Sequence, residues 1–161
     1  MSIGNVLVRD AGPLLAAEPP VNLVRAALVE RLGTPVLAVC GQQVPVPGLL
    51  RLRPSLRRHL GRPVVFGVRP EHLQDALVGR PAAAGPAVLV LHGVVRRVRP
   101  DGAHRVVHVE LADVDSGQLP VPTMVARVSR HSSAGVGDAI MVAVDTQHLM
   151  MFDADSGRSL W

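Results

Sequence analysis

Short runs rich in Val and Leu, separated by turn residues about every eight to twelve positions, constrain the fold of this chain most strongly. The clearest pair is 87–100 and 104–114, which flank Pro100-Asp101-Gly102, a tripeptide typical of a hairpin turn. Fourteen Pro and fifteen Gly favour frequent turns over long helices. The pattern therefore predicts an all-β sandwich or barrel. Further extended segments are expected at 22–30, 34–41, 62–70, 119–129, 136–145 and 148–153.

The remaining segments divide the chain. The double proline at Pro19 and Pro20 blocks a helix, so residues 1–20 are expected to be a lead-in segment. We expect a first β subdomain at 21–80 and a second at 81–161. Within the first, Gly33 and Thr34 predict a turn. The proline-interrupted stretch 42–48 predicts an edge strand, and 52–62 predicts a short helix starting near Pro54.

Composition excludes several kinds of chemistry. All seventeen basic residues are Arg, so a GxxxxGK[ST] phosphate loop and Schiff-base catalysis through Lys are both impossible in this sequence. GxSxG does not occur, and no order of Ser, His and Asp stands out. We therefore expect no enzyme activity, no catalytic residue and no cofactor. Aromatic residues make up only 2%, which predicts an aliphatic core that includes Cys40, the single cysteine.

Location is indicated by what the sequence does not show. No basic region followed by an apolar stretch marks a signal peptide, and no run of eighteen apolar residues marks a membrane span. We expect a cytoplasmic protein that meets the membrane only through a partner. The net charge of +4 permits acidic partners without specifying one.

Two patterns resemble metal sites. His104, His108 and Glu110 share one face of a predicted strand, but the ligand count is short and a polar solvent face is favoured. Asp153, Asp155 and Gly157 resemble a calcium loop that lacks its closing Glu, so a β-turn is favoured there. We expect no metal site.

Two arginine clusters raise the question of nucleic-acid binding. Three aromatic residues in the chain are too few for a base-stacking platform. A solvated face or an arginine-rich protein contact is favoured, and no nucleic-acid partner is expected. The clusters are Arg51, Arg53, Arg57, Arg58 and Arg62, and Arg96, Arg97 and Arg99.

Four ordered patches resemble one family. They are PPVNLV at 19–24, FGVRPEHL at 66–73, VARVSRHSSAGVGDAIMVAVD at 125–145 and HLMMFDADSGRSL at 148–160. Together they resemble the C-terminal regulatory OB/TOBE region of the ATPase subunits of maltose-type (MalK-like) sugar ABC importers. The resemblance implies two interlocked OB-like (TOBE) β-barrel subdomains with one or two short helices. The family's ATP-hydrolysing motifs are not found in this sequence.

The resemblance also selects signature residues. In the first signature, Pro70 ends a strand and suits the first position of a helical turn, where a carboxylate such as Glu71 is favoured. We expect these residues to lock a strand-to-turn corner; the alternative is contact with a partner. The full signature set is Arg69, Pro70, Glu71, His72, Phe152, Asp153 and Gly157.

By resemblance, the expected role is a regulatory and interaction domain. A homodimer is the expected state, and further partners would be a separate ABC ATPase/permease assembly or a regulatory protein. The alternative is a stand-alone TOBE-type module for an oxyanion such as molybdate, with hydroxyls from Ser129, Ser132 and Ser133.

Overall fold

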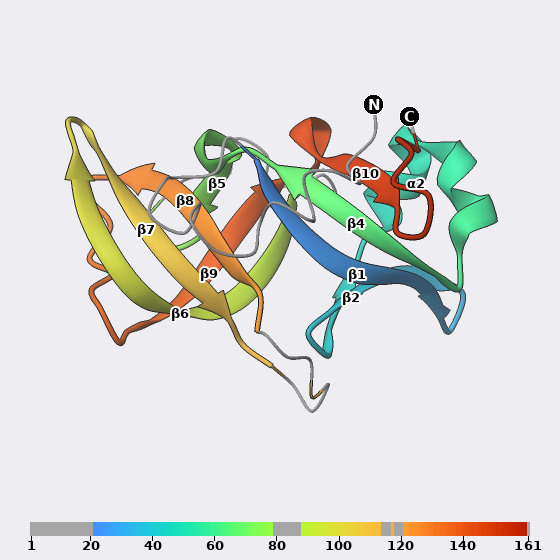
Figure 1. Ribbon diagram of the computed structural model, residues 1–161, viewed down its shortest axis with the longest axis horizontal. Coiled ribbons are helices and arrows are strands. Elements are labelled where there is room, and N and C mark those ends of the chain that lie inside the picture. The colour runs from blue at the N-terminus through green and yellow to red at the C-terminus, as the bar shows by residue number, and fades with distance from the viewer. Residues whose placement is uncertain (1–20, 79–87, 114–116, 118–120, 161) are drawn as a thin grey trace.

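The computed structural model describes residues 21–78, 88–113, 117 and 121–160. They form two five-stranded sheets that lie side by side, with few helices, which confirms the predicted all-β class (Figure 1). The predicted lead-in segment 1–20 lies outside the described residues. The first sheet contains β1 (Asn22–Arg31), β2 (Thr34–Val39), β3 (Gln42–Pro45), β4 (Arg62–Val68) and β10 (Met150–Asp153). The second contains β5 (Leu73–Asp75), β6 (Val88–Asp101), β7 (His104–Leu111), β8 (Thr123–Ser129) and β9 (Ala139–Asp145).

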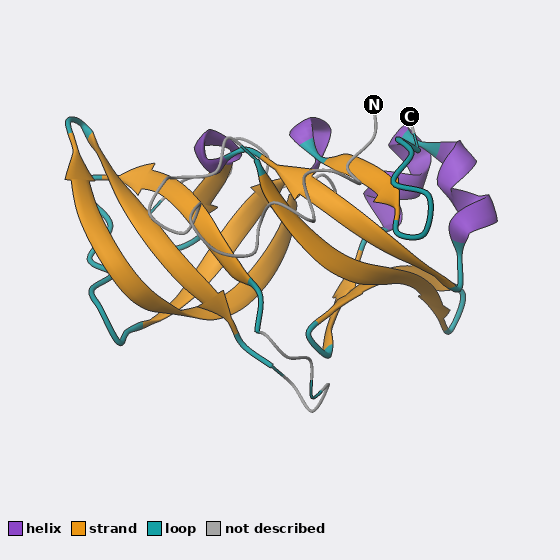
Figure 2. Ribbon diagram, viewed as in Figure 1, coloured by secondary structure: helices purple, strands orange, loops and turns teal. Residues whose placement is uncertain are grey.

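All neighbouring strands are antiparallel, in the orders β10-β4-β1-β2-β3 and β5-β9-β6-β7-β8. The second sheet curves so that its two outer strands, β5 and β8, come into contact, and it is nearly closed into a barrel. The helical elements are short: α2 (Pro47–Leu52) and the 3₁₀ turns η2 (Pro54–His59), η3 (Pro70–His72) and η4 (Thr146–His148). Figure 2 shows α2 and η2 at one end of the molecule and η3 and η4 along one rim.

Tight turns connect the hairpins. The hairpin predicted at Pro100-Asp101-Gly102 is confirmed, with Gly102 at a φ of +61° between β6 and β7. The β1–β2 turn comprises Leu32 and Gly33, one residue earlier than predicted. Leu32 has a φ of 51° and Gly33 a φ of 78°, the left-handed pair that matches the twist of a two-residue hairpin. Leucine is an unusual residue in this conformation.

The helical region differs from the prediction in part. The 3₁₀ turn η2 begins at Pro54 as expected, but an α-helix precedes it and begins at Pro47. Pro47 stands at the start of α2, where its missing N–H is not needed. Consequently the predicted edge strand 42–48 ends at Pro45, although β3 does form the edge of the first sheet.

The chain interlocks the two sheets. The last strand, β10, returns to the first sheet and pairs with β4, whereas β5 belongs to the second sheet and pairs with β9. The boundary predicted at residue 80 therefore lies within the sequence span of both sheets.

One largely aliphatic cluster of buried residues runs through both sheets, as the low aromatic content predicted. The same buried cluster contains Leu28 and Leu37 of the first sheet and Leu91 and Val107 of the second. Cys40 also belongs to this cluster. Burial, and to a smaller extent the charge of Asp113, raises the pKa of its thiol. A raised pKa keeps this cysteine in the neutral form that suits a buried site.

Two buried amide side chains join the sheets. Asn22 of β1 donates from Nδ2 to the carbonyl oxygens of Val68 (3.1 Å) and Val125 (2.9 Å), and its Oδ1 accepts from the Val125 N–H at 2.7 Å. Gln42 of β3 makes the equivalent contacts to β6 and to the residue that follows β7. Because each amide presents a donor and an acceptor as a peptide group does, it continues the hydrogen bonding of one sheet into the other.

Candidate functional site

The FGVRPEHL signature forms one of two crossovers between the sheets. In one direction the chain runs from β4 through η3 to β5, and in the other it runs from β9 through η4 to β10. Gly67 faces Met150 on one side of the junction, and Leu73 faces Val144 on the other. Each crossover therefore takes six residue steps (73 − 67 and 150 − 144), and the strand register is the same on both sides.

Two imidazole rings connect the crossovers. His72 of η3 and His148 of η4 stack with 4.0 Å between ring centroids and 4° between ring planes. His148 Nδ1 lies 2.9 Å from Asp145 Oδ2, and Asp145 also accepts from the Gln147 N–H at 2.9 Å. The signature histidine is thus held by His148 of the other crossover.

The backbone at the corner has the predicted form. Arg69 is extended, with φ −76° and ψ 148°, and Pro70 begins η3. The His72 N–H donates to the Arg69 carbonyl at 3.0 Å, after which Leu73 is fully buried in β5. Proline at the first position of the turn and extended geometry before it are what the residue types favour.

The charged members of the signature point to solvent. The side chains of Arg69 and Glu71 are 60% and 47% exposed, and Arg69 Nη1 lies 4.0 Å from Glu71 Oε1. An exposed ion pair of this length contributes little to stability. Pro70 and His72 thus provide the contacts that shape the corner, while Arg69 and Glu71 are accessible from outside.

The second signature forms a turn towards the other end of β4. Phe152 is buried beside Val65, and Asp153 pairs with Val64. The Asp153 carboxylate accepts from the backbone N–H groups of Ser156 (2.8 Å) and Asp155 (2.9 Å), and these two bonds lower its pKa. Gly157 has a φ of +70°, and its N–H donates to the Asp153 carbonyl at 2.8 Å. A tight turn is present as predicted, but its backbone bond closes over five residues, from Gly157 to Asp153.

The His104–Glu110 row lies on β7 and is interrupted by a buried apolar side chain. Glu110 accepts from Arg96 Nη2 at 3.1 Å and Nε at 3.2 Å, so its carboxylate is engaged with β6. Val106, which lies between the polar members of the row, is 2% exposed. Within the described ranges, no three His, Cys, Asp or Glu side chains are placed to hold a metal ion.

Two of the three serines proposed for anion capture, Ser129 and Ser132, are hydrogen-bonded within the chain, and Ser133 is exposed. Ser132 Oγ donates to the buried Asp75 Oδ2 at 2.6 Å and accepts from the Ala134 N–H at 3.3 Å. Ser129 Oγ accepts from the His131 N–H at 3.2 Å. A carboxylate beside Ser132 disfavours an anion there.

Sequence reasoning missed Asn22, Gln42 and Asp75 as site-forming residues. Each is a buried polar residue in a predominantly apolar setting. Since buried polar side chains in folded proteins are hydrogen-bonded, an isolated amide or carboxylate at an inward strand position was the available signal.

No helix among the described residues is long and apolar enough to cross a membrane.

Two known domain families match this chain. The MalK OB fold domain matches residues 18–73, and the TOBE domain matches residues 87–151. The chain is a MalK-type OB fold joined to a TOBE domain. This confirms the resemblance drawn from the four sequence patches.

Relatives of the OB–TOBE chain include ATP-binding proteins of sugar importers. The trehalose import ATP-binding protein SugC of Mycobacterium tuberculosis is 36% identical over 60% of this chain and 28% of its own length. The trehalose/maltose import ATP-binding protein MalK of Thermococcus litoralis is 27% identical over 89% of this chain and 35% of its own length. The chain spans about a third of the length of these curated relatives.

A solved structure shares the fold. The cytoplasmic molybdate-binding protein ModG aligns with a TM-score of 0.51 and 15% sequence identity, covering 84% of this chain and 96% of that chain. At this identity the likeness describes the architecture of the OB–TOBE chain and not its ligand.

Proposed function

We propose that this OB–TOBE chain is a regulatory and interaction domain that works with a sugar ABC importer, without hydrolysing ATP itself. The observation that carries the proposal is the corner at η3: its backbone is fixed, yet Arg69 and Glu71 are exposed. Charged residues held on a rigid scaffold and directed to solvent are suited to recognition. The sequence contains no Lys, which a Walker A phosphate loop requires.

The expected partners follow from the relatives, which are importer ATP-binding proteins. We infer that the chain acts in the cytoplasm, pairs with a second copy of itself, and contacts an ABC ATPase/permease assembly or a regulatory protein. Its link to the membrane would be indirect, through that assembly.

Affinity capture from the native host tests this proposal. The tagged chain is cross-linked in cells, and captured proteins are identified by mass spectrometry. The wild type is expected to capture an ABC importer subunit, and Arg69→Ala/Glu71→Ala is expected to lose it. A matched control, Arg25→Ala/Glu30→Ala, replaces one exposed arginine and one exposed glutamate of β1 and should retain capture. The proposal would be contradicted if the wild-type chain captured no importer subunit.

A second candidate function is oxyanion binding, supported by the fold shared with ModG, whose structure contains molybdate. The internal bonding of Ser129 and Ser132 weighs against those hydroxyls as ligands. Titration calorimetry with sodium molybdate separates the candidates. The interaction domain should give no heat of binding, whereas a saturable, stoichiometric signal would favour the oxyanion module.

A further inference from the structure

One stretch of the chain lacks acidic residues altogether. Residues 31–70 contain seven Arg and no Asp or Glu, although the whole chain carries thirteen acidic residues. Arg69 belongs to the signature corner, and Arg31 lies beside the β1–β2 turn. The remaining five lie in α2, at the junction of α2 with η2, in η2 and at the first position of β4.

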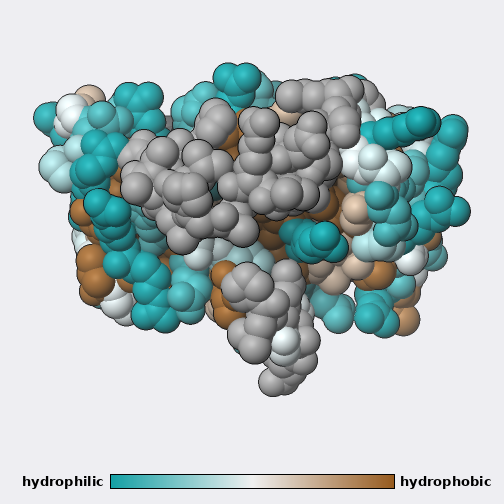
Figure 3. All heavy atoms as spheres, viewed as in Figure 1, coloured by the Kyte–Doolittle hydropathy of each residue, from teal (hydrophilic) through white to brown (hydrophobic). Residues whose placement is uncertain are grey.

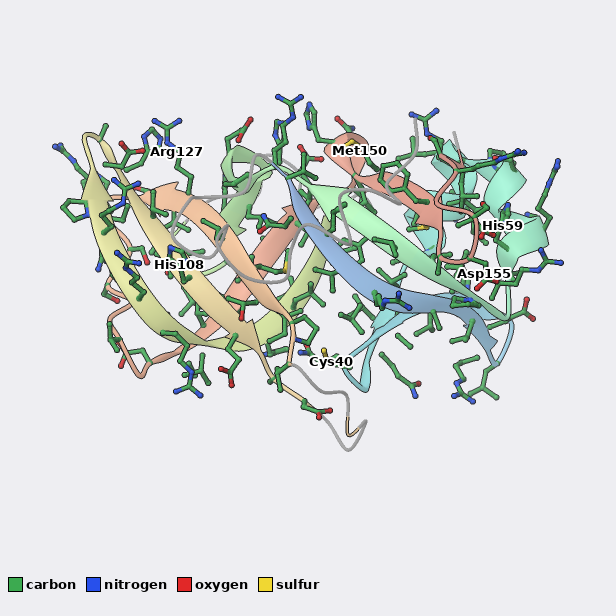
Figure 4. All side chains as sticks on the ribbon, in the orientation of Figure 1. Cys40, His59, His108, Arg127, Met150 and Asp155 are labelled. Carbon is green, nitrogen blue, oxygen red and sulfur yellow. The ribbon has the colours of Figure 1, made fainter. Side chains whose placement is uncertain are left out.

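Local folding directs these arginines outward. In α2 and η2 the leucines Leu49, Leu50 and Leu56 are buried against the core, with exposed fractions of 1%, 5% and 0%. The basic residues between them therefore face solvent, and all five are exposed. Figure 4 shows side chains with nitrogen tips projecting from this end, and Figure 3 shows hydrophilic atoms gathered there. The arginine surface comprises Arg51, Arg53, Arg57, Arg58 and Arg62.

The carboxylates that the structure describes form no ion pair with most of these arginines. Across the described residues, Arg51, Arg57, Arg58 and Arg62 take part in none of the ion pairs. The turn that contains Asp153 and Asp155 lies at the same end of the molecule, and the Asp153 carboxylate already accepts two backbone hydrogen bonds within that turn.

The composition of the surface selects among anionic partners. A membrane-binding helix needs an outward apolar face, but here the leucines face the core and only Leu52, at 50% exposure, is exposed among them. Binding of single-stranded nucleic acid needs stacking aromatics, and residues 47–62 contain no Phe, Tyr or Trp. Arginine forks bind carboxylates through paired hydrogen bonds.

We propose that the arginine surface docks an acidic segment of a partner protein, a stretch of Asp and Glu side chains. Leu52 provides an apolar contact among the arginines. The inference goes beyond the proposed function, and it stands even if no importer subunit is captured, because its test uses only this chain and a peptide.

The test is fluorescence anisotropy of a fluorescein-labelled peptide of about ten glutamates, titrated with the full 161-residue chain at low salt. Saturable binding that weakens at ~0.5 M salt is expected, and a matched peptide of glutamines should not bind. Arg51→Gln/Arg57→Gln/Arg58→Gln should weaken binding about tenfold, as loss of several charged contacts implies.

The control variant, Arg25→Gln/Arg97→Gln/Arg130→Gln, removes the same charge from exposed positions elsewhere and should change affinity less than about twofold. The single charge reversal Arg58→Glu gives an independent readout with minimal risk to folding, and it should also weaken binding. Equal losses in both triple variants would reduce the effect to net charge and overturn the proposal. So would no binding of the glutamate peptide, or tighter binding of the wild type to anionic phosphatidylglycerol vesicles or to an oligothymidine strand.

Discussion

Gln42 and His92 pair as if they were residues of adjacent strands, although one contributes a side chain and the other its backbone. The His92 N–H donates to Gln42 Oε1 at 2.9 Å, and Gln42 Nε2 donates to the His92 carbonyl at 2.9 Å. The same Nε2 reaches the Ala112 carbonyl at 2.8 Å. One amide therefore ties β3 of the first sheet to β6 and to the end of β7 in the second.

The first prediction concerns this clamp. Gln42→Ala should lower the free energy of unfolding by about 2–4 kcal/mol, because the His92 N–H and the Ala112 carbonyl lose their partner. The matched control is Gln43→Ala, an exposed neighbour on the same strand, for which a change within about 0.5 kcal/mol is expected. Urea unfolding followed by circular dichroism measures both. Equal effects of the two substitutions would show that the clamp is unimportant.

The second prediction concerns the matched crossovers. Deletion of Gln147 shortens one of them by a residue, shifts the register across the junction, and should cost about 3 kcal/mol or more. Deletion of Glu71 should act similarly. The double deletion restores equal lengths and should recover at least about half of the loss. Thermal unfolding of the three variants decides the matter, and simple additivity would refute register coupling.

The third prediction separates the roles of the corner residues. Arg69→Ala and Glu71→Ala should each change stability by less than about 1 kcal/mol, since their ion pair is long and exposed. His72→Ala should cost about 1 kcal/mol by removing the stack with His148. Chemical denaturation compares them. A larger loss of unfolding free energy for Arg69→Ala than for His72→Ala would show that the charged pair, and not the histidine stack, stabilises the corner.

The fourth prediction concerns acid stability. Backbone hydrogen bonds lower the pKa of Asp153 in the folded chain, so its contribution to stability is present above the ordinary carboxyl value of 3.8. That contribution is lost as the pH falls below 3.8 and through the lowered folded-state pKa. Melting temperatures recorded from about pH 6 to about pH 2 should fall less steeply for Asp153→Asn. Asp155→Asn, whose carboxylate accepts neither bond, should retain the wild-type slope.

The fifth prediction is self-association. Two-fold dimers are the commonest oligomers, and a homodimer is the state that the family resemblance implies for this chain. Light scattering over a range of protein concentrations should show a mass rising towards twice 17.1 kDa. A monomeric mass up to high micromolar concentration would limit the chain to association with a different partner.

Local sequence patterns predicted the strands well because their causes are local. Gly102 permits the β6–β7 turn, and the alternating apolar residues around Val142 define β9. The α-helix at Pro47 was missed because a proline inside an apparently extended stretch is equally typical of a strand edge and of a helix start.

Long-range features could not be predicted from such patterns. Nothing in the four residues of β10 indicates that they pair with β4 and not with a nearer strand. The stacking of His72 on His148 depends on two segments 76 positions apart (148 − 72) meeting with equal lengths. Residue types announced a corner at Pro70, whereas only the fold shows that Arg69 and Glu71 face outward.

The equal lengths of the two crossovers also restrict how such chains can diverge. An insertion or deletion of one residue between Gly67 and Leu73 shifts the pairing of β5 with β9 by one residue, which turns each side chain to the opposite face of the sheet. A change of the same length between Val144 and Met150 restores the pairing. In an alignment of OB–TOBE chains with this topology, gaps in these two segments should therefore occur together, in the same lineages and with the same length. Elsewhere, in the hairpin turns, gaps should be independent of one another.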